Sequence, residues 1–304
     1  MAKTLVLAEK PSVGKELARV LGCRRGGEGC LEGERYIVTW ALGHLVELAP
    51  PEAYDKAWEK WDLLTLPMLP EHMKTAVIKE TGRQFRAVQA LMRRGDVQEL
   101  VIATDAGREG ELVARWIMEK AGWNKPAKRL WISSQTDKAI RDGFSHLRPA
   151  GEYDDLFHSA RARSEADWLV GLNVTRALTC KHGAQLSAGR VQTPTLALVV
   201  ERQKAIENFK PETYWEIRTN YREGLFSCLR GRFNKKEEAE ALLEKITPLE
   251  LEILSIERKK AMEHPPKLFD LTLLQVECNR KFAYTAENTL KIIQSLYEKK
   301  LTTY

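Results

Sequence analysis

The stretch that decides the fold runs from Leu100 to Glu111 and reads LVIATDAGREGE. Its first four residues form a short apolar, partly β-branched run, which predicts a buried parallel strand. A polar break with a glycine follows, and an apolar helical repeat then continues through Trp116 and Ile117. A strand that leads into a helix places Asp105 just beyond the strand's carboxyl end, where open α/β sheets carry their chemistry.

Two acids at this junction suggest a metal site. Glu109 falls in the first turn of the predicted helix, where the positive end of the helix dipole keeps a carboxylate charged. Asp105 and Glu109 repel each other unless a cation lies between them. Oxygen ligands without a nearby Cys or His favour Mg²⁺ over zinc. A lone D-x-x-x-E is also typical of a capped, solvated helix start, so the rest of the chain must decide.

Composition limits the class of protein. A length of 304 residues predicts two or more domains, and 43% hydrophobic with 30% charged residues is typical of a soluble globular protein. No apolar segment approaches the roughly 20 residues of a membrane span, and the N-terminus lacks a secretory pattern, so a cytoplasmic protein is expected. Five scattered cysteines without a C-x-x-C pair indicate neither a zinc site nor a disulfide framework. The net charge of +6 permits a polyanionic partner but is a weak signal, because 42 acids accompany 48 bases.

The N-terminus repeats the strand–turn–helix pattern. An apolar strand at 5–8 ends in Glu9 and Lys10, and a helix follows. If this strand neighbours the one before Asp105, Glu9 should face the same crevice. Gly14-Lys15 suggests a phosphate-binding P-loop, but Glu9 occupies its first glycine position and Glu16 stands where Ser or Thr should bind Mg²⁺. An ATP site is therefore not expected.

The remaining pattern predicts a multidomain α/β protein. Alternating strands and helices up to about residue 150 favour a mostly parallel sheet with helices on both faces. This part includes strands at 36–40 and 130–132, helices at 82–93 and after Ser134 or Thr136, and a mobile glycine-rich loop at 24–33.

The second half changes character twice. It becomes helical from about residue 154, and Thr193-Pro194 should open another helix as cap and first-turn proline. Strands at 214–221, 226–230 and 249–256 around a charged helix at 235–245 predict an antiparallel sheet. A hinge at 264–266 and two closing helices, the second from near Thr285, complete the pattern.

Six motifs in order point to a family: LAEKPS, ATDAGREGELVARWI, RLWISSQT, RARSEADWLVGLNVTRA, SAGRVQTPTLALV and LYEKKLTTY. Together they resemble the type IA DNA topoisomerases, and their topoisomerase III-like branch most closely. The resemblance implies a TOPRIM metal-binding catalytic domain at 1–150, a helical single-strand DNA-binding region at 151–210, a β-rich arch segment at 211–263, and at 264–304 the start of a tyrosine-bearing domain, which would be truncated.

The resemblance also implies a reaction. Such enzymes cleave, pass and rejoin single DNA strands through a 5′-phosphotyrosine intermediate, with Mg²⁺ and without ATP, and so relax or decatenate DNA. The substrate would be single-stranded or underwound duplex DNA, and the protein would be cytoplasmic and nucleoid-associated.

Roles follow by position in the family's motifs. Tyr304 matches the nucleophile, Glu9 the group that exchanges a proton with the 3′-oxygen, and Lys10 the contact to the scissile phosphate. Glu9, Asp105 and Glu109 match Mg²⁺ ligands. Gly107 stands where the family has its middle acid, which predicts weaker metal affinity because one charged oxygen ligand is missing.

Two neighbours of the motif have open roles. Glu111 could replace the missing acid, but it lies about 200° from Glu109 around a helix and would need an irregular turn. An exposed helix acid is the simpler interpretation of Glu111. Arg108 either holds a phosphate or pairs with an acid.

Candidate DNA contacts lie after residue 160. Arg161 and Arg163 would point about 200° apart on one helix, and each has an acid four residues later that offers a salt bridge instead. Trp168 and Tyr297 are predicted core residues. A turn before a helix start suits phosphate and sugar contacts; the candidates there are Ser187, Gly189, Arg190 and Gln192.

Two other functions remain open at this stage. Another TOPRIM enzyme, a primase or nuclease, would need no tyrosine motif, so the match at 285–304 disfavours it. A non-catalytic module that binds single strands and metal is the other alternative, because the sequence stops at the expected nucleophile.

Overall fold

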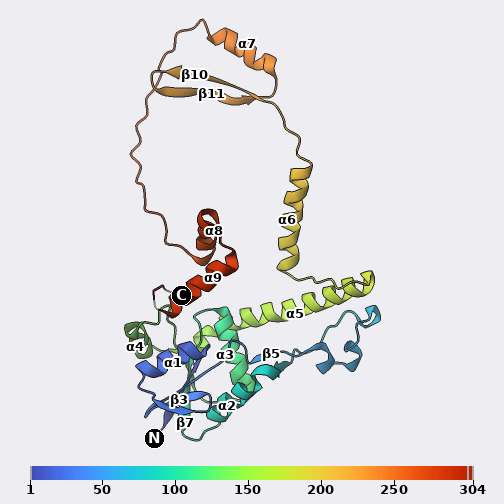
Figure 1. The fold of residues 1–304 in the computed structure, drawn as a ribbon, viewed down its shortest axis with the longest axis vertical. Helices are drawn as coiled ribbons and strands as arrows, with labels where there is room; N and C mark the ends of the chain where they lie inside the picture. The colour runs from blue at the N-terminus through green and yellow to red at the C-terminus, as the bar shows by residue number, and fades with distance from the viewer. Residues whose placement is uncertain (1, 300, 303–304) are drawn as a thin grey trace. The chain divides into compact units, whose positions relative to one another are not determined.

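The computed structural model describes residues 2–299 and 301–302, so Tyr304 lies outside the described residues. Contacts divide the chain into two units, residues 1–194 with 269–304 and residues 195–268 (Figure 1).

The first unit is built on a seven-stranded sheet of order β2-β3-β4-β1-β7-β8-β9. The four central strands β4, β1, β7 and β8 are parallel, which confirms the predicted parallel sheet at its centre, and antiparallel strands close both edges. The strands are β1 (Lys3–Ala8), β2 (Arg25–Gly27), β3 (Cys30–Glu32), β4 (Tyr36–Trp40), β7 (Val97–Ala103), β8 (Ala127–Arg129) and β9 (Arg148–Pro149), with a separate pair β5 (Val46–Leu48) and β6 (Thr75–Val77).

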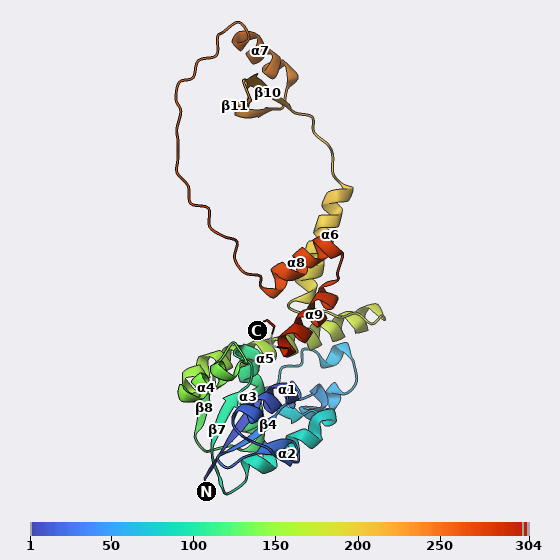
Figure 2. The ribbon, with the colours of Figure 1, turned by 60° about the vertical axis from the view of Figure 1, so that its left-hand side comes forward.

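Helices cover both faces of this sheet, as predicted (Figure 2). The helices of the first unit are α1 (Pro11–Val20), α2 (Gly82–Met92), α3 (Arg108–Ala121), α4 (Asp137–Ser145), α5 (Asp154–His182), α8 (Leu271–Phe282) and α9 (Ala286–Glu298). Short 3-10 turns occur at Pro51–Ala53, Lys56–Trp58, Leu63–Thr65, Lys79–Thr81 and Ala150–Tyr153. Among the described residues, no helix is both long and apolar enough to cross a membrane.

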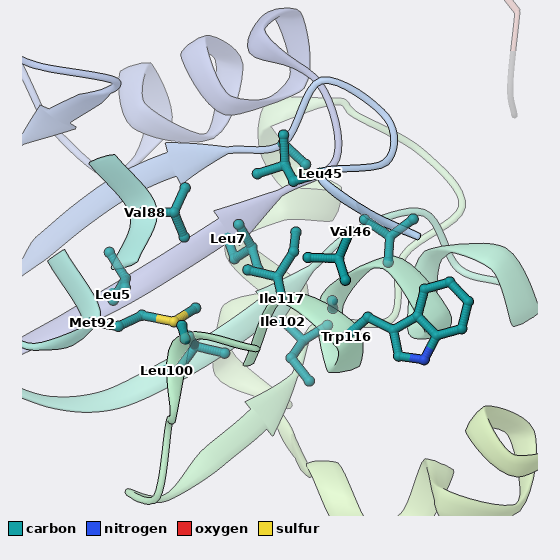
Figure 3. Close-up of a cluster of buried hydrophobic side chains, with 14 of the residues drawn as sticks. Leu5, Leu7, Leu45, Val46, Val88, Met92, Leu100, Ile102, Trp116 and Ile117 are labelled. Carbon is teal, nitrogen blue, oxygen red and sulfur yellow. The ribbon is translucent and has the colours of Figure 1, made fainter. Parts of the chain in front are cut away.

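The two central strands contribute alternate residues to two cores. Leu5 and Leu7 of β1 face α2 and α3, with Ile102 of β7 beside them (Figure 3). Val6 and Val101 face α1 and α4 on the other side. Because both faces are buried, residues 5–8 of β1 and 100–103 of β7 are continuously apolar rather than alternating.

The register of β1 and β7 positions the site. Ala8 pairs with Ala103, so both strands reach the sheet edge at the same level. Glu9 follows one strand and Asp105 follows the other within two residues. The carboxyl ends of these neighbouring strands therefore present both acids to one crevice.

Two predictions in the first unit were wrong. The strand expected at 130–132 lies earlier, at β8. The Leu130 N–H is still bonded to the Ile102 carbonyl of β7 over 2.9 Å, but the residues after it do not continue the pairing. The loop expected at 24–33 forms the hairpin β2–β3, whose turn is closed by Gly29 at φ +65°. Glu32 fixes this hairpin to the sheet through ion pairs with Lys3, Arg25 and Arg94.

The second unit contains a hairpin of β10 (Trp215–Tyr221) and β11 (Gly224–Phe233), with α7 (Lys236–Ile246) packed on it. The strand predicted at 249–256 was wrong. Among the described residues nothing pairs with this segment, and Leu254 is 86% exposed, so its alternating pattern has no sheet to join. Helix α6 (Gln192–Glu207) begins two residues before Pro194 rather than at it.

The ion pairs of Glu32 predict acid-sensitive stability. Hydrogen bonds from Arg94 and then Lys3 lower the pKa of Glu32 to about 2. A depressed carboxyl pKa stabilises the fold above the unfolded value of about 4.5, and that contribution is lost as pH falls toward about 2. Glu32→Gln should therefore lower the free energy of unfolding at pH 7 by roughly 1–3 kcal/mol, with the difference shrinking below pH 4.5. Urea unfolding at pH 7 and pH 3 measures this; an equal difference at both would contradict it.

Candidate active site at the carboxyl edge of the sheet

The site is centred on an acidic pair. The Asp105 backbone N–H donates to Oε2 of Glu9 over 3.0 Å, so the two residues meet as the sequence predicted for neighbouring strands. Burial raises the pKa of the Glu9 carboxyl, and the charge of Asp105 raises it further, against the opposing effects of the Asp105 N–H, Lys10 and Arg129. Glu9 therefore keeps a proton to higher pH than an exposed glutamate. That property suits proton exchange with a substrate oxygen.

The turn that carries Asp105 is held tightly against α3. The Thr104 hydroxyl donates to the Gly110 carbonyl over 2.7 Å. A Cβ at position 110 would lie 2.2 Å from the Asp105 carbonyl oxygen, so only glycine allows this approach. Gly107 differs, because its backbone is extended and an added Cβ would meet nothing within 4 Å. The structure therefore has room for an acidic side chain at position 107, where the family has its middle acid.

Glu111 has a role that the sequence did not suggest. It is neither an exposed helix acid nor a free metal ligand, because it is fully buried and both carboxylate oxygens are engaged. Arg129 Nε donates to Oε2 over 2.9 Å and Arg115 Nε donates to Oε1 over 2.9 Å. The buried Arg129 also donates to the carbonyls of Thr104, at 2.7 Å, and Asp105, at 2.6 Å. The ion pair of Arg129 and Glu111 therefore holds the turn that carries Asp105 against the buried side of the sheet.

The predicted three-carboxylate metal site is not assembled. Across residues 2–299 and 301–302, no three His, Cys, Asp or Glu side chains gather closely enough to hold a metal ion. Glu109 is exposed in the first turn of α3, apart from the pair. The donors present still fit Mg²⁺, which proteins commonly bind through one or two carboxylates while substrate phosphates supply other oxygens. Glu9 and Asp105 are the residues that could hold it.

Three arginines line an open pocket of about 460 Å³: Arg108, Arg163 and Arg190. Arg190 is held there by an ion pair with Asp167, Nη1 to Oδ1 at 2.9 Å. Arg161 is turned away and pairs with Glu165 over 2.8 Å, as its opposite position on the helix implies. The structure therefore joins Arg163 and Arg190 with Arg108. The salt bridges that the sequence offered as an alternative are present for both helix arginines, because Arg163 Nε also lies 3.9 Å from Oδ2 of Asp167.

The loop before α6 is fastened to α5 by threonines. Thr175 and Thr179 exchange hydrogen bonds with the backbone of Ala188 and Leu186, at 2.9 to 3.2 Å. This attachment places Arg190 beside α5. The other predicted contacts there do not line the pocket: Ser187 and Gln192 are exposed, and the Gly189 N–H donates to the Thr193 hydroxyl over 3.0 Å.

Tyr297 was assigned to the core, but it lies at the site. It lines a pocket together with Lys10, Asp105 and Gln135. Tyr297 has the same apolar helical spacing as a core residue, so the sequence could not distinguish the two positions. Trp168 was predicted to be a core residue, but it is only partly buried and belongs to neither core; its Nε1 donates to the Ala49 carbonyl over 3.0 Å and its ring lies edge-on to Tyr54.

Comparisons with known proteins agree with this arrangement. Residues 4–135 match the family model described as Toprim domain, and residues 151–304 match the one described as DNA topoisomerase. The protein named DNA topoisomerase 3 in Bacillus cereus is 53% identical over all of this chain, and that in Bacillus subtilis is 52% identical. The chain spans 42% and 43% of the lengths of these relatives.

A solved structure supports the fold. The full-length topoisomerase I of Thermotoga maritima superimposes with a TM-score of 0.63 at 24% identity, over 97% of this chain and 46% of the other. With family models covering both its TOPRIM sheet and everything from α5 onward, the chain belongs to the type IA DNA topoisomerase family, in its topoisomerase III-like branch.

Proposed function

We propose that this chain carries the catalytic portion of an enzyme that cleaves and rejoins single DNA strands, and so changes DNA topology without ATP. The observation that carries the proposal is the contact between Glu9 and Asp105 at the ends of adjacent parallel strands. Lys10 and Asp105 both line the neighbouring pocket, so opposite charges face one cavity. Such a site can bind a phosphate while holding a proton donor next to it.

The reaction we infer is a transesterification. The oxygen of Tyr304 attacks phosphorus, the bond from phosphorus to the 3′-oxygen breaks, and a 5′-phosphotyrosine forms. The tyrosine gives its proton to water, and the departing 3′-oxygen takes one from Glu9, whose raised pKa supports this role. Water then returns a proton to Glu9. Rejoining reverses these steps. One phosphoester replaces another, so no nucleotide cofactor is consumed.

Mg²⁺ held by Glu9 and Asp105 would offset negative charge on the phosphate during this exchange. Lys10 supplies a fixed positive charge on the same side of the pocket. Glu109 as a further ligand stays a prediction.

The arginine pocket supports binding of the strand's backbone. Arg108, Arg163 and Arg190 come from α3, α5 and the loop before α6, and their charges converge on one open pocket. Arginine forks suit phosphate oxygens, and single strands bind best in positively charged grooves. Ser187, Gly189 and Gln192 would extend this contact along the loop, whereas Arg161 is proposed only as an outlying charge.

A labelled single-stranded oligonucleotide with Mg²⁺ tests the proposal. We expect a covalent protein–DNA adduct that survives denaturation and disappears when the metal is chelated before mixing. Retention of the oligonucleotide on a filter without an adduct would favour the second candidate, a module that only binds single strands. The exposed arginine pocket is the observation that keeps this alternative open. Relaxation of negatively supercoiled plasmid then tests strand passage, for which underwound duplex would be the substrate.

Gly107→Asp tests the metal argument. The position has room for a side chain, and a third carboxylate near Glu9 and Asp105 adds a charged oxygen ligand. We expect the Mg²⁺ concentration for half-maximal adduct formation to fall about three- to tenfold. Without metal, the added charge should lower the midpoint of thermal unfolding.

Gly107→Asn is the matched control, since it adds the same shape without the charge. Direct Mg²⁺ titration by calorimetry gives a readout that needs no DNA. Equal metal affinity in both variants and the unchanged chain would contradict a role for the missing acid.

A further inference from the structure

Helix α9 touches the TOPRIM sheet through a small seat. It packs mainly on α8, and its Leu290 and Ile292 remain 45% and 46% exposed. Gln294 and Tyr297, three residues apart on one face, are the α9 residues that line a pocket beside Asp105. Gln294 and Tyr297 therefore contribute to the attachment of α9 at this edge.

The ring of Tyr297 is inserted between elements of the active site. It lines two adjoining pockets with Val13 and Glu16 of α1, with Asp105 after β7, and with Gln135 before α4. Its hydroxyl forms a hydrogen bond with the Gln135 side chain. A single residue of α9 therefore contacts three connections at the carboxyl edge of the sheet.

The environment of Tyr297 argues against a nucleophilic role. Burial, and then the charges of Asp105 and Glu9, raise its pKa to about 12, against the opposing hydrogen bond of Gln135. A partly buried ring that is hydrogen-bonded to Gln135 is suited to holding α9 in place rather than to attacking phosphorus.

Chain connectivity links this seat to Tyr304. Tyr304 lies seven positions after Tyr297, and an extended chain of seven steps spans at most about 25 Å. Holding Tyr297 against the Asp105 turn thus limits how far Tyr304 can lie from the acidic pair. Without the contact between Tyr297 and the Asp105 turn, the segment that carries Tyr304 would be tethered only through α8.

We propose that Tyr297 is a positioning residue, whose ring seats α9 on the Asp105 turn and so keeps the tyrosine-bearing segment within reach of Glu9 and Asp105. The inference rests on the proposed function for its consequence, but the seat itself exists independently of any reaction. The aromatic ring of Tyr297 makes the contact with the Asp105 turn, and the hydrogen bond with Gln135 orients the ring.

The test compares the full chain with Tyr297→Ala, Tyr297→Phe and the matched control Tyr284→Ala. Tyr284 is another half-exposed tyrosine, in the turn between α8 and α9, and it contacts Phe282 rather than the site. Amide hydrogen exchange without DNA or metal reports the seat. We expect Tyr297→Ala to speed exchange in 286–298 about tenfold or more, with 97–103 unchanged, and Tyr297→Phe and Tyr284→Ala to resemble the unchanged chain.

Adduct formation on a single-stranded oligonucleotide reports the consequence. Tyr297→Ala should slow it about 10- to 100-fold, while oligonucleotide affinity stays within about twofold because the arginine pocket lies elsewhere. Tyr297→Phe should keep the rate within about threefold, since the ring is retained.

Unchanged exchange and adduct rate in Tyr297→Ala would overturn the inference, as would a Phe variant as defective as the Ala variant. If the unchanged chain forms no adduct, the proposed function fails. The exchange measurement still decides whether Tyr297 seats α9.

Discussion

Arg129→Met should reduce the free energy of unfolding by about 3–5 kcal/mol, because it leaves the Glu111 carboxylate buried without its main partner. Arg129 and Glu111 are both fully buried, and Nε to Oε2 is 2.9 Å. Burial lowers the pKa of the Arg129 guanidinium, and the charge of Glu111 opposes that effect. Each charged group is therefore stabilised in the core by the other. The variant also loses the donors to the carbonyls of Thr104 and Asp105.

Urea unfolding at neutral pH measures this loss. Arg115→Met is the matched control, since Arg115 also binds Glu111 but is 16% exposed, and Arg129 would still neutralise the carboxylate. The double change Arg129→Met with Glu111→Leu should regain a large part of the stability, because no buried charge is left. A loss of less than about 1 kcal/mol in Arg129→Met would show that the pair is not a structural anchor.

Tyr304→Phe should abolish adduct formation, by about a thousandfold or more, because it removes the oxygen that we propose attacks phosphorus. Oligonucleotide affinity should stay within about twofold, since we expect the backbone of the strand to be bound by Arg108, Arg163 and Arg190. Adduct yield on a denaturing gel and binding by fluorescence anisotropy measure the two effects separately.

Tyr297→Phe is the matched control for Tyr304→Phe, because it removes the same atom seven residues earlier. Equal adduct yields from Tyr304→Phe and the unchanged chain would mean that another group carries the DNA.

Much of the central fold could be predicted from the sequence. β1 and β7 are apolar on both faces, and each ends in acids before a helix, so neighbouring parallel strands required Glu9 to approach Asp105. Local patterns sufficed there because a strand that is apolar on both faces can be buried only in the centre of a sheet that is covered on both sides. The helix start at Thr136 was similarly predictable, since its hydroxyl accepts from the Ala139 N–H.

Features that depend on distant partners were not predictable in this way. Glu111 looked like a surface acid because its partner Arg129 lies 18 residues further along the chain, on β8 rather than on α3. The segment 249–256 alternates like a strand, but nothing in the described chain pairs with it. Tyr297 has the spacing of a core residue, and only the docking of α9 shows that it faces Asp105.

The central claim is that the acidic pair serves a nucleophile at Tyr304. Digestion of the oligonucleotide adduct followed by tandem mass spectrometry locates the modified residue most directly. We expect a nucleotide joined through its 5′-phosphate to Tyr304. A nucleotide on Tyr297 or on any other residue, or a bound oligonucleotide with no covalent link at all, would contradict the claim.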